Sequence, residues 1–115
     1  MSELTEKVSD FLKVLCDQTR LEILELLKNG EKTSEDIQEA LHKTQSTISL
    51  QLKKLLDENI IGFEKKKEEK VSINYYRVKN DYIFKLLSNI QSFVITLQKD
   101  KLEKLLDLDK YDTLL

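Results

Sequence analysis

A change of hydrophobic period near residue 60 constrains the fold of this chain more than any other feature. Before it, apolar side chains recur every three or four residues, which is typical of amphipathic helices. Residues 60–78 instead hold two short runs rich in β-branched and aromatic residues, which favour strands. Helical spacing returns from Ile83 onward. The sequence therefore predicts a mostly α chain with one small β-hairpin (α+β), and its 115 residues suit a single domain over 1–115.

Local signals mark where the helices before the hairpin begin and end. Short polar side chains that accept hydrogen bonds from a helix N-terminus stand at Asp17, Thr33 and Thr44. Residues that tolerate the left-handed conformation, and so end helices, stand at Gly30, His42 and Asn59. Asp36 adds a capping box to Thr33. These signals predict four helices before the hairpin.

The last two of these helices form a helix-turn-helix over residues 33–57, because a turn of only a few residues separates them. The hairpin at 60–78 follows directly and makes the motif winged. Its charged segment, residues 64–70, is predicted to be the tip, and the absence of an Asn-Gly pair leaves the register open. A last long helix is predicted to begin after Asp81, and we expect the residues from Asp107 onward to fray.

Four short motifs occur in a defined order between residues 15 and 78. They are Leu-Cys-Asp-Gln-Thr-Arg-Leu-Glu-Ile-Leu at 15–24, Gln-Ser-Thr-Ile-Ser-Leu-Gln-Leu-Lys at 45–53, Leu-Leu-Asp-Glu-Asn-Ile-Ile at 55–61 and Asn-Tyr-Tyr-Arg-Val at 74–78. Together they resemble the ArsR family of winged-helix repressors. The resemblance implies a homodimer that binds operator DNA and is often released by an effector.

The metal-binding motifs of that family are absent from this sequence. Metal-sensing members carry paired cysteines where this chain has Thr33 and Glu35, or histidines on the last helix, which has none here. We therefore predict no metal and no cofactor, and the effector stays open. The single cysteine, Cys16, is expected to be a small buried apolar residue, with a redox switch as the alternative. Arg20 is expected to pair with a carboxylate.

The net charge of −2 hides a polarity along the chain. Nine basic and five acidic residues lie between Lys43 and Asn80, which gives +4, and the remainder is −6. In a helix-turn-helix, polar side chains at the start of the second helix contact base edges, and lysines suit phosphate. The predicted DNA contacts are Thr44, Gln45, Ser46, Thr47, Ser49, Leu50, Lys53, Lys54, Lys65, Lys66, Lys67, Lys70 and Arg77. Alternatively, residues 44–47 form only a helix cap and the lysines only a solvated hairpin.

The first and last helices, within 1–16 and 81–106, carry more apolar surface than a small domain buries. The predicted dimer interface is Leu4, Val8, Phe11, Ile83, Leu87, Ile90, Phe93, Val94 and Leu97. The alternative is that these residues only cover the core of one chain. A two-fold dimer places two recognition helices about one DNA turn apart, which predicts a pseudo-palindromic operator.

Composition excludes several classes of protein. No apolar run approaches the roughly 20 residues that span a bilayer, and the first residues lack signal-peptide character, so we expect a cytoplasmic protein. No nucleophile–base pair or phosphate-binding loop indicates an enzyme. The leading hypothesis is a homodimeric, sequence-specific transcriptional repressor. It would contact the major groove through helix 44–58 and the backbone or minor groove through the wing. The alternative is a winged-helix protein-interaction module.

Overall fold

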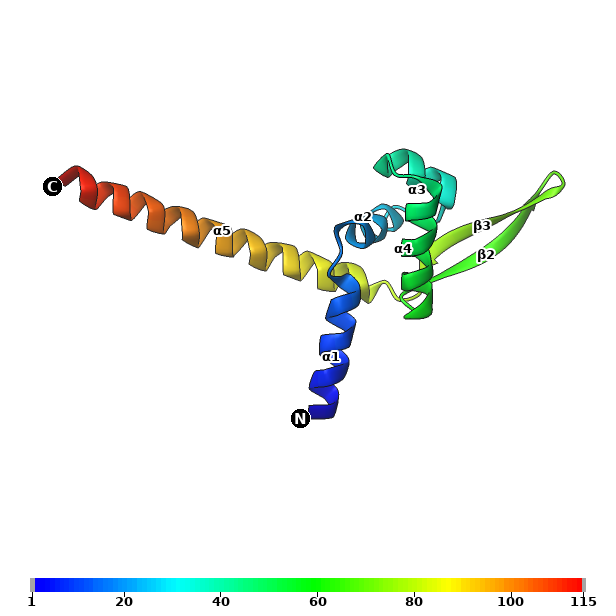
Figure 1. The fold of residues 1–115 in the computed structure, drawn as a ribbon, viewed down its shortest axis with the longest axis horizontal. Helices are drawn as coiled ribbons and strands as arrows, with labels where there is room; N and C mark the ends of the chain where they lie inside the picture. The colour runs from blue at the N-terminus through cyan, green and yellow to red at the C-terminus, as the bar shows by residue number, and fades with distance from the viewer. Residues whose placement is uncertain (1, 115) are drawn as a thin grey trace. The chain divides into compact units, whose positions relative to one another are not determined.

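The computed structural model divides into two compact units, Met1–Asp81 and Tyr82–Leu115, which we describe separately. It describes residues 2–114, with side chains as far as Asp107. In chain order the elements are α1 (Ser2–Leu15), α2 (Gln18–Leu27), β1 (Lys32–Thr33), α3 (Ser34–Leu41), α4 (Gln45–Asp57), β2 (Ile61–Glu68), β3 (Val71–Val78) and α5 (Tyr82–Leu114) (Figure 1). The predicted winged helix-turn-helix is thus confirmed, and the prediction of one domain over 1–115 stays a prediction.

The predicted helix caps are also confirmed. The Asp17 carboxylate accepts a hydrogen bond from the backbone N–H of Arg20, and Thr33 and Asp36 form a reciprocal capping box. Thr44 accepts from the backbone N–H of Thr47 at the start of α4. The left-handed residues predicted to end helices have positive φ angles: Gly30 at 120°, His42 at 54° and Asn59 at 59°.

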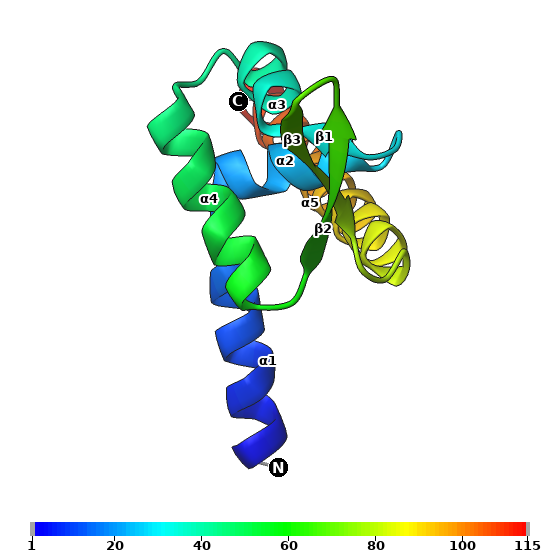
Figure 2. The ribbon, with the colours of Figure 1, turned by 90° about the vertical axis from the view of Figure 1, so that its right-hand side faces the viewer.

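Apolar side chains from three helices and the sheet meet in one core. Figure 2 shows α4 and the sheet on either side of α2, with α3 closing one end. The largest fully buried side chains are Ile23, Leu24, Ile37, Ile48, Leu55 and Ile61. Because Ile48 and Leu55 anchor α4 from one side only, its opposite face is left to solvent.

The sheet differs from the predicted hairpin in two ways. First, β1 pairs antiparallel with β3, so the sheet has three strands in the order β1-β3-β2. A two-residue strand has no period of its own, which is why the sequence did not predict it. Second, β2 continues through the charged segment to Glu68, and only Glu69 and Lys70 form the turn. The prediction that residues 64–70 form the tip is therefore wrong, because pairing with β3 extends the strand.

The second unit consists of α5, which extends over 33 residues. The expected fraying from Asp107 is not observed, since the helix continues to Leu114; Leu115 lies outside the described residues. Leucine and lysine in this stretch favour a helix, and no proline or glycine interrupts it. Within the described residues, no helix combines the length and apolar character needed to cross a membrane.

The left-handed conformation of His42 leads to a stability prediction. Replacing His42 by glycine removes the contact between Cβ and backbone that this conformation imposes, so we expect the free energy of unfolding to rise by about 0.5–1 kcal/mol. Lys43→Gly is the matched control. Because Lys43 lacks a positive φ, this change should lower the free energy of unfolding by about 0.5–1 kcal/mol. Urea unfolding of both variants measures the difference. Equal destabilisation by both changes would contradict the prediction.

Candidate nucleic-acid interface

The two faces of α4 have opposite characters. Ile48, Leu52 and Leu55 are buried, and the predicted contact residues Gln45, Ser46, Ser49, Leu50, Lys53 and Lys54 are exposed on the other side. Leu50 is 51% exposed, so its apolar side chain belongs to this outward face. The outward face therefore carries an amide, hydroxyls, an apolar tip and two ammonium groups. These groups match the donors, acceptors and methyl groups of base edges, and the phosphates beside them.

Three hydroxyl groups at the start of α4 bind one another. The Thr44 hydroxyl donates to Thr47 Oγ1 at 3.0 Å and lies 3.2 Å from Ser46 Oγ. It also accepts from the Thr47 backbone N–H at 3.3 Å. The capping alternative thus explains Thr44 and Thr47. It leaves Gln45 and Leu50 unexplained, because neither side chain takes part in the cap.

Arg20 connects three helices from a buried position. The residue is 8% exposed, its Nε donates to the Val14 carbonyl oxygen of α1 at 2.5 Å, and its Nη1 donates to Gln51 Oε1 of α4 at 2.6 Å. The expectation that Arg20 pairs with a carboxylate is wrong. Both acceptors are neutral and one is a backbone group, so no charge pattern in the sequence indicated them. The guanidinium fixes α4 relative to the end of α1.

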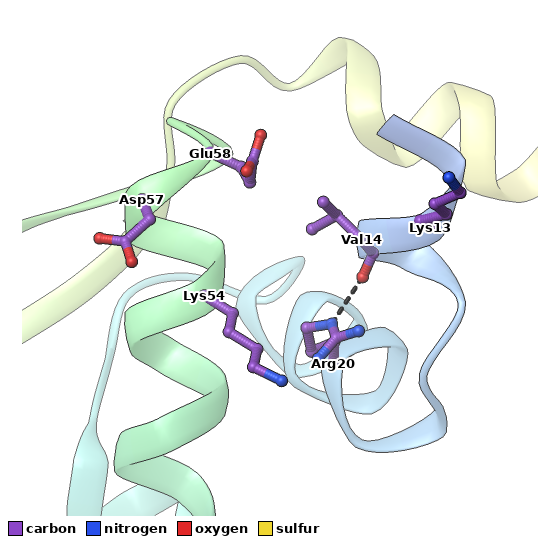
Figure 3. A pocket seen from close by; sticks show the side chains of 6 residues that line it. All are labelled: Lys13, Val14, Arg20, Lys54, Asp57 and Glu58. Carbon is purple, nitrogen blue, oxygen red and sulfur yellow. Dashed lines mark hydrogen bonds between the residues drawn. The ribbon is translucent and has the colours of Figure 1, made fainter. Parts of the chain in front are cut away.

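A cavity of about 260 Å³ lies beside this guanidinium (Figure 3). Lys13 and Val14 of α1, Arg20 of α2, Lys54 and Asp57 of α4, and the following residue Glu58 line it. In Figure 3, the Lys54 side chain extends toward Arg20. The Asp57 carboxylate binds Lys53 Nζ at 3.3 Å. This ion pair offsets the charge of Lys53, whereas the Lys54 ammonium stays exposed for an anion.

The lysines of the wing, residues 61–78, lie on two different faces. Lys65 and Lys67 stand opposite Asn74 and Ser72, on the face that also carries Phe63 and Tyr76, whose rings lie 5.9 Å apart. Lys66 stands on the other face with Tyr75. All three lysines are exposed, as are Lys70 in the turn and Arg77.

Lys66 has partners within the chain that the sequence did not reveal. Its ammonium forms an ion pair with Glu31 and lies 4.9 Å from the centre of the Tyr75 ring. The Tyr75 hydroxyl donates in turn to Glu68. The hydrogen bond to Glu31 raises the pKa of Lys66 above its usual 10.5, and the hydrogen bond to Glu68 raises the pKa of Tyr75 above 10.0. Both shifts favour the protonated forms, the ammonium of Lys66 and the phenol of Tyr75.

A groove of about 650 Å³ separates the wing from the N-terminal ends of α3 and α4. Gln45 and the tyrosines of β3 line it, together with the carboxylates of Glu35, Asp36 and Glu68. Three carboxylates in one groove disfavour phosphate there. The cationic surface is instead formed by the outward face of α4 and the Lys65–Lys67 face of β2.

Cys16 is exposed at the junction of α1 and α2, so the expectation of a buried thiol is wrong. It lies at one end of a shallow apolar surface on α1 that includes Val8 and Leu12. Leu4, Val8 and Leu12 on this helix are 70%, 49% and 49% exposed. Among the described residues, no three His, Cys, Asp or Glu side chains gather in a way that could hold a metal ion.

The predicted interface residues of α5 differ in exposure. Phe93 is 64% exposed, and Ile90, Val94 and Leu97 are also exposed, while Ile83 and Leu87 are half-buried. Phe11 of α1 is half-buried as well. An exposed apolar stripe of this length is typical of a helix that packs against another molecule.

Comparison with known proteins gives consistent results. The profile of the family described as "Bacterial regulatory protein, arsR family" matches residues 17–62. The arsenical resistance operon repressor of Bacillus subtilis (strain 168) is 41% identical over 88 residues, which cover 76% of this chain and 80% of that protein. The homodimeric winged helix-turn-helix DNA-binding domain Mb0332 from Mycobacterium bovis, a possible ArsR-family transcriptional regulator, superimposes with a TM-score of 0.65 and 28% identity. That superposition covers 81% of this chain and 82% of the solved one.

A second solved structure, Rv0081 of M. tuberculosis, shares the fold at a TM-score of 0.76. Its sequence identity is 20%, with 86% of this chain and 96% of that one covered.

The Arg20 contacts lead to a second stability prediction. Arg20→Lys keeps the charge but cannot donate to Val14 and Gln51 together, so we expect a loss of about 2 kcal/mol in the free energy of unfolding. Lys54→Arg, on the opposite wall of the same cavity, should change it by less than about 0.5 kcal/mol. Thermal unfolding followed by circular dichroism compares the two. A loss below 0.5 kcal/mol for Arg20→Lys would show that the three-helix contact does not stabilise the fold.

Proposed function

This chain belongs to the ArsR family of bacterial regulatory proteins, and on that premise we propose that it is a homodimeric repressor that binds operator DNA. It is a DNA-binding transcriptional regulator and not an enzyme. Because a bacterial transcriptional regulator binds DNA in the cytoplasm, we propose the cytoplasm as its location. The proposal extends to the residues that contact DNA and to the interface that joins two copies.

The exposed face of α4 is the observation that carries the proposal. A helix whose one side is anchored by Ile48, Leu52 and Leu55 presents the other side rigidly, which suits insertion into the major groove. We assign base contacts to Gln45 and Leu50, since an amide pairs well with adenine and an apolar tip with the thymine methyl group. We assign Ser46 and Ser49 to contacts with base edges or with the phosphates beside those bases.

Phosphate contacts follow from the exposed ammonium groups. Lys53 and Lys54 at the end of α4, and Lys65, Lys67 and Lys70 of the wing, are exposed cations, and Lys53 also forms an exposed ion pair with Asp57 at 3.3 Å. We propose that the first two bind the backbone beside the major groove and that the wing lysines bind the next stretch of backbone or the minor groove. Arg77 is exposed at the base of β3 and supports the same surface.

A second copy of the chain is the proposed occupant of the apolar stripes on α1 and α5. Leu4, Val8, Ile90, Phe93 and Val94 are exposed, which leaves apolar surface for an interface. The Mycobacterium bovis relative is homodimeric, which supports the same arrangement here. Two-fold symmetry then presents two copies of α4 to two half-sites of a pseudo-palindromic operator.

The base contact of Gln45 can be tested with a matched glutamine. Gln45 and Gln18 are each exposed and each the first residue of a helix, α4 and α2 respectively. We expect Gln45→Ala to weaken operator binding about tenfold or more and to relax preference at one position of each half-site, because a bidentate amide contact contributes about 1–3 kcal/mol. Gln18→Ala should bind like the unmodified protein. Selection from random DNA followed by gel-shift titration gives both quantities.

The outcome also separates the two candidate functions. Equal affinity for operator and random DNA would contradict sequence-specific binding. No DNA binding even at low salt would favour a protein-interaction module instead.

The dimer interface can be tested with a pair of neighbouring substitutions. Phe93→Glu places a charge on the exposed apolar stripe of α5, and Ser92→Glu places the same charge one residue away. We expect Phe93→Glu to raise the dimer dissociation constant at least tenfold, because a carboxylate buried against a second apolar stripe lacks a partner. Sedimentation equilibrium measures the constant. If both substitutions have the same effect, Phe93 lies outside the interface.

A further inference from the structure

The outer half of the wing has few stabilising interactions of its own. Every residue from Phe63 to Lys70 is exposed, and the paired residues 73–76 of β3 are only half-buried, so this part of the hairpin buries little apolar surface. The turn at Glu69 and Lys70 lacks the Asn-Gly pair that stabilises a two-residue turn, and Glu69 is left-handed at φ 58°. An isolated two-stranded hairpin is only marginally stable in water. The wing therefore needs a tertiary contact to keep one orientation.

The structure supplies such a contact across all three strands of the sheet. Lys66 of β2 reaches over the ring of Tyr75 in β3, 4.9 Å from its centre, and binds Glu31 immediately before β1. The Tyr75 hydroxyl binds Glu68 near the end of β2. Glu31 itself is anchored, because β1 is paired with β3 and leads directly into the capping box of α3. The contact thus joins the far part of the wing to the body of the domain.

We propose that Glu31, Lys66, Tyr75 and Glu68 form a brace that fixes the orientation of the wing, and that Lys66 is a positioning residue and not a phosphate contact. The part of this proposal that concerns DNA rests on the proposed function above. Two features support the assignment. The charge of Lys66 is already compensated by Glu31, and Glu64 and Glu68 flank it on the same face. The phosphate contacts of β2 are then made by Lys65 and Lys67, which lie on the face of β2 that carries no carboxylate.

Glu31→Gln distinguishes positioning from simple electrostatics. If Glu31 only lowers the positive potential near DNA, its removal should strengthen DNA binding. If Glu31 positions the wing, its removal should weaken operator binding about two- to fivefold, the range expected for loss of an exposed ion pair. Glu39→Gln is the control, because Glu39 is an acid that lines the same surface pocket as Glu31 and the ion pair of Lys66 is with Glu31.

The salt dependence of binding distinguishes the three lysines. In a homodimer each lysine occurs twice. Losing its phosphate contact should therefore reduce the steepness with which the logarithm of the association constant falls with the logarithm of salt concentration, by about 1.8. We expect this decrease for Lys65→Met and for Lys67→Met. Lys66→Met should leave the slope unchanged and weaken binding as much as Glu31→Gln. A decrease of about 1.8 for Lys66→Met would overturn its assignment as a positioning residue.

Hydrogen exchange of the free protein tests the brace without DNA. Backbone amides of Lys65–Glu68 and Val71–Tyr75 should exchange about two- to fivefold faster in Glu31→Gln and in Lys66→Met than in the unmodified protein. The double variant should exchange at the same rate as either single variant, because both changes remove the same ion pair. Glu39→Gln should leave them unchanged. Unchanged exchange in both brace variants would overturn the brace. Faster exchange in a protein that binds no operator would sustain the brace and contradict only the proposed function.

Discussion

A single guanidinium joins the three helices on which the rest of the domain is built. Arg20 is charged and buried, and such a group is tolerated only where its donors find acceptors. It finds them in the Val14 carbonyl group and the Gln51 amide, so α1, α2 and α4 share one hydrogen-bonded centre. Because α4 presents Gln45 and Leu50, the direction of the proposed DNA contacts depends on a residue that does not touch DNA. The apolar core anchors α4, and Arg20 ties the middle of this helix to the end of α1.

Charge is divided over the molecule in a way that favours one approach of DNA. The segment 43–80 is net positive and the rest of the chain is net negative. The ion pair of Lys66 with Glu31 reduces the positive charge that the wing offers to DNA. The resulting cationic surface is small for one subunit. We therefore expect useful affinity only when two subunits bind together, because each subunit offers few proposed phosphate contacts. Dimerisation and DNA binding are therefore expected to be strongly coupled.

Local features of the fold could be predicted from the sequence, and features that depend on distant residues could not. The caps at Asp17, Thr33 and Thr44 and the left-handed residues His42 and Asn59 were predictable, because their causes lie within four residues. The acceptors of Arg20, the strand β1 and the pairing of Lys66 with Glu31 depend on residues up to 44 positions away and on the register of the sheet. For the candidate site, the outward face of α4 followed from its period, whereas the two faces of the wing needed the structure.

The order of the strands has a consequence for the solubility of the protein. With the order β1-β3-β2, the strand β2 lies at the edge of the sheet, and one side of its backbone has no strand partner among the described residues. Open edges of this kind recruit strands from other molecules and lead to aggregation. The run of three lysines at positions 65–67 places charge on both faces of that edge, so that two copies brought edge to edge repel each other. We therefore expect the lysines proposed for the DNA contacts and the brace also to disfavour assembly of the free protein through its wing.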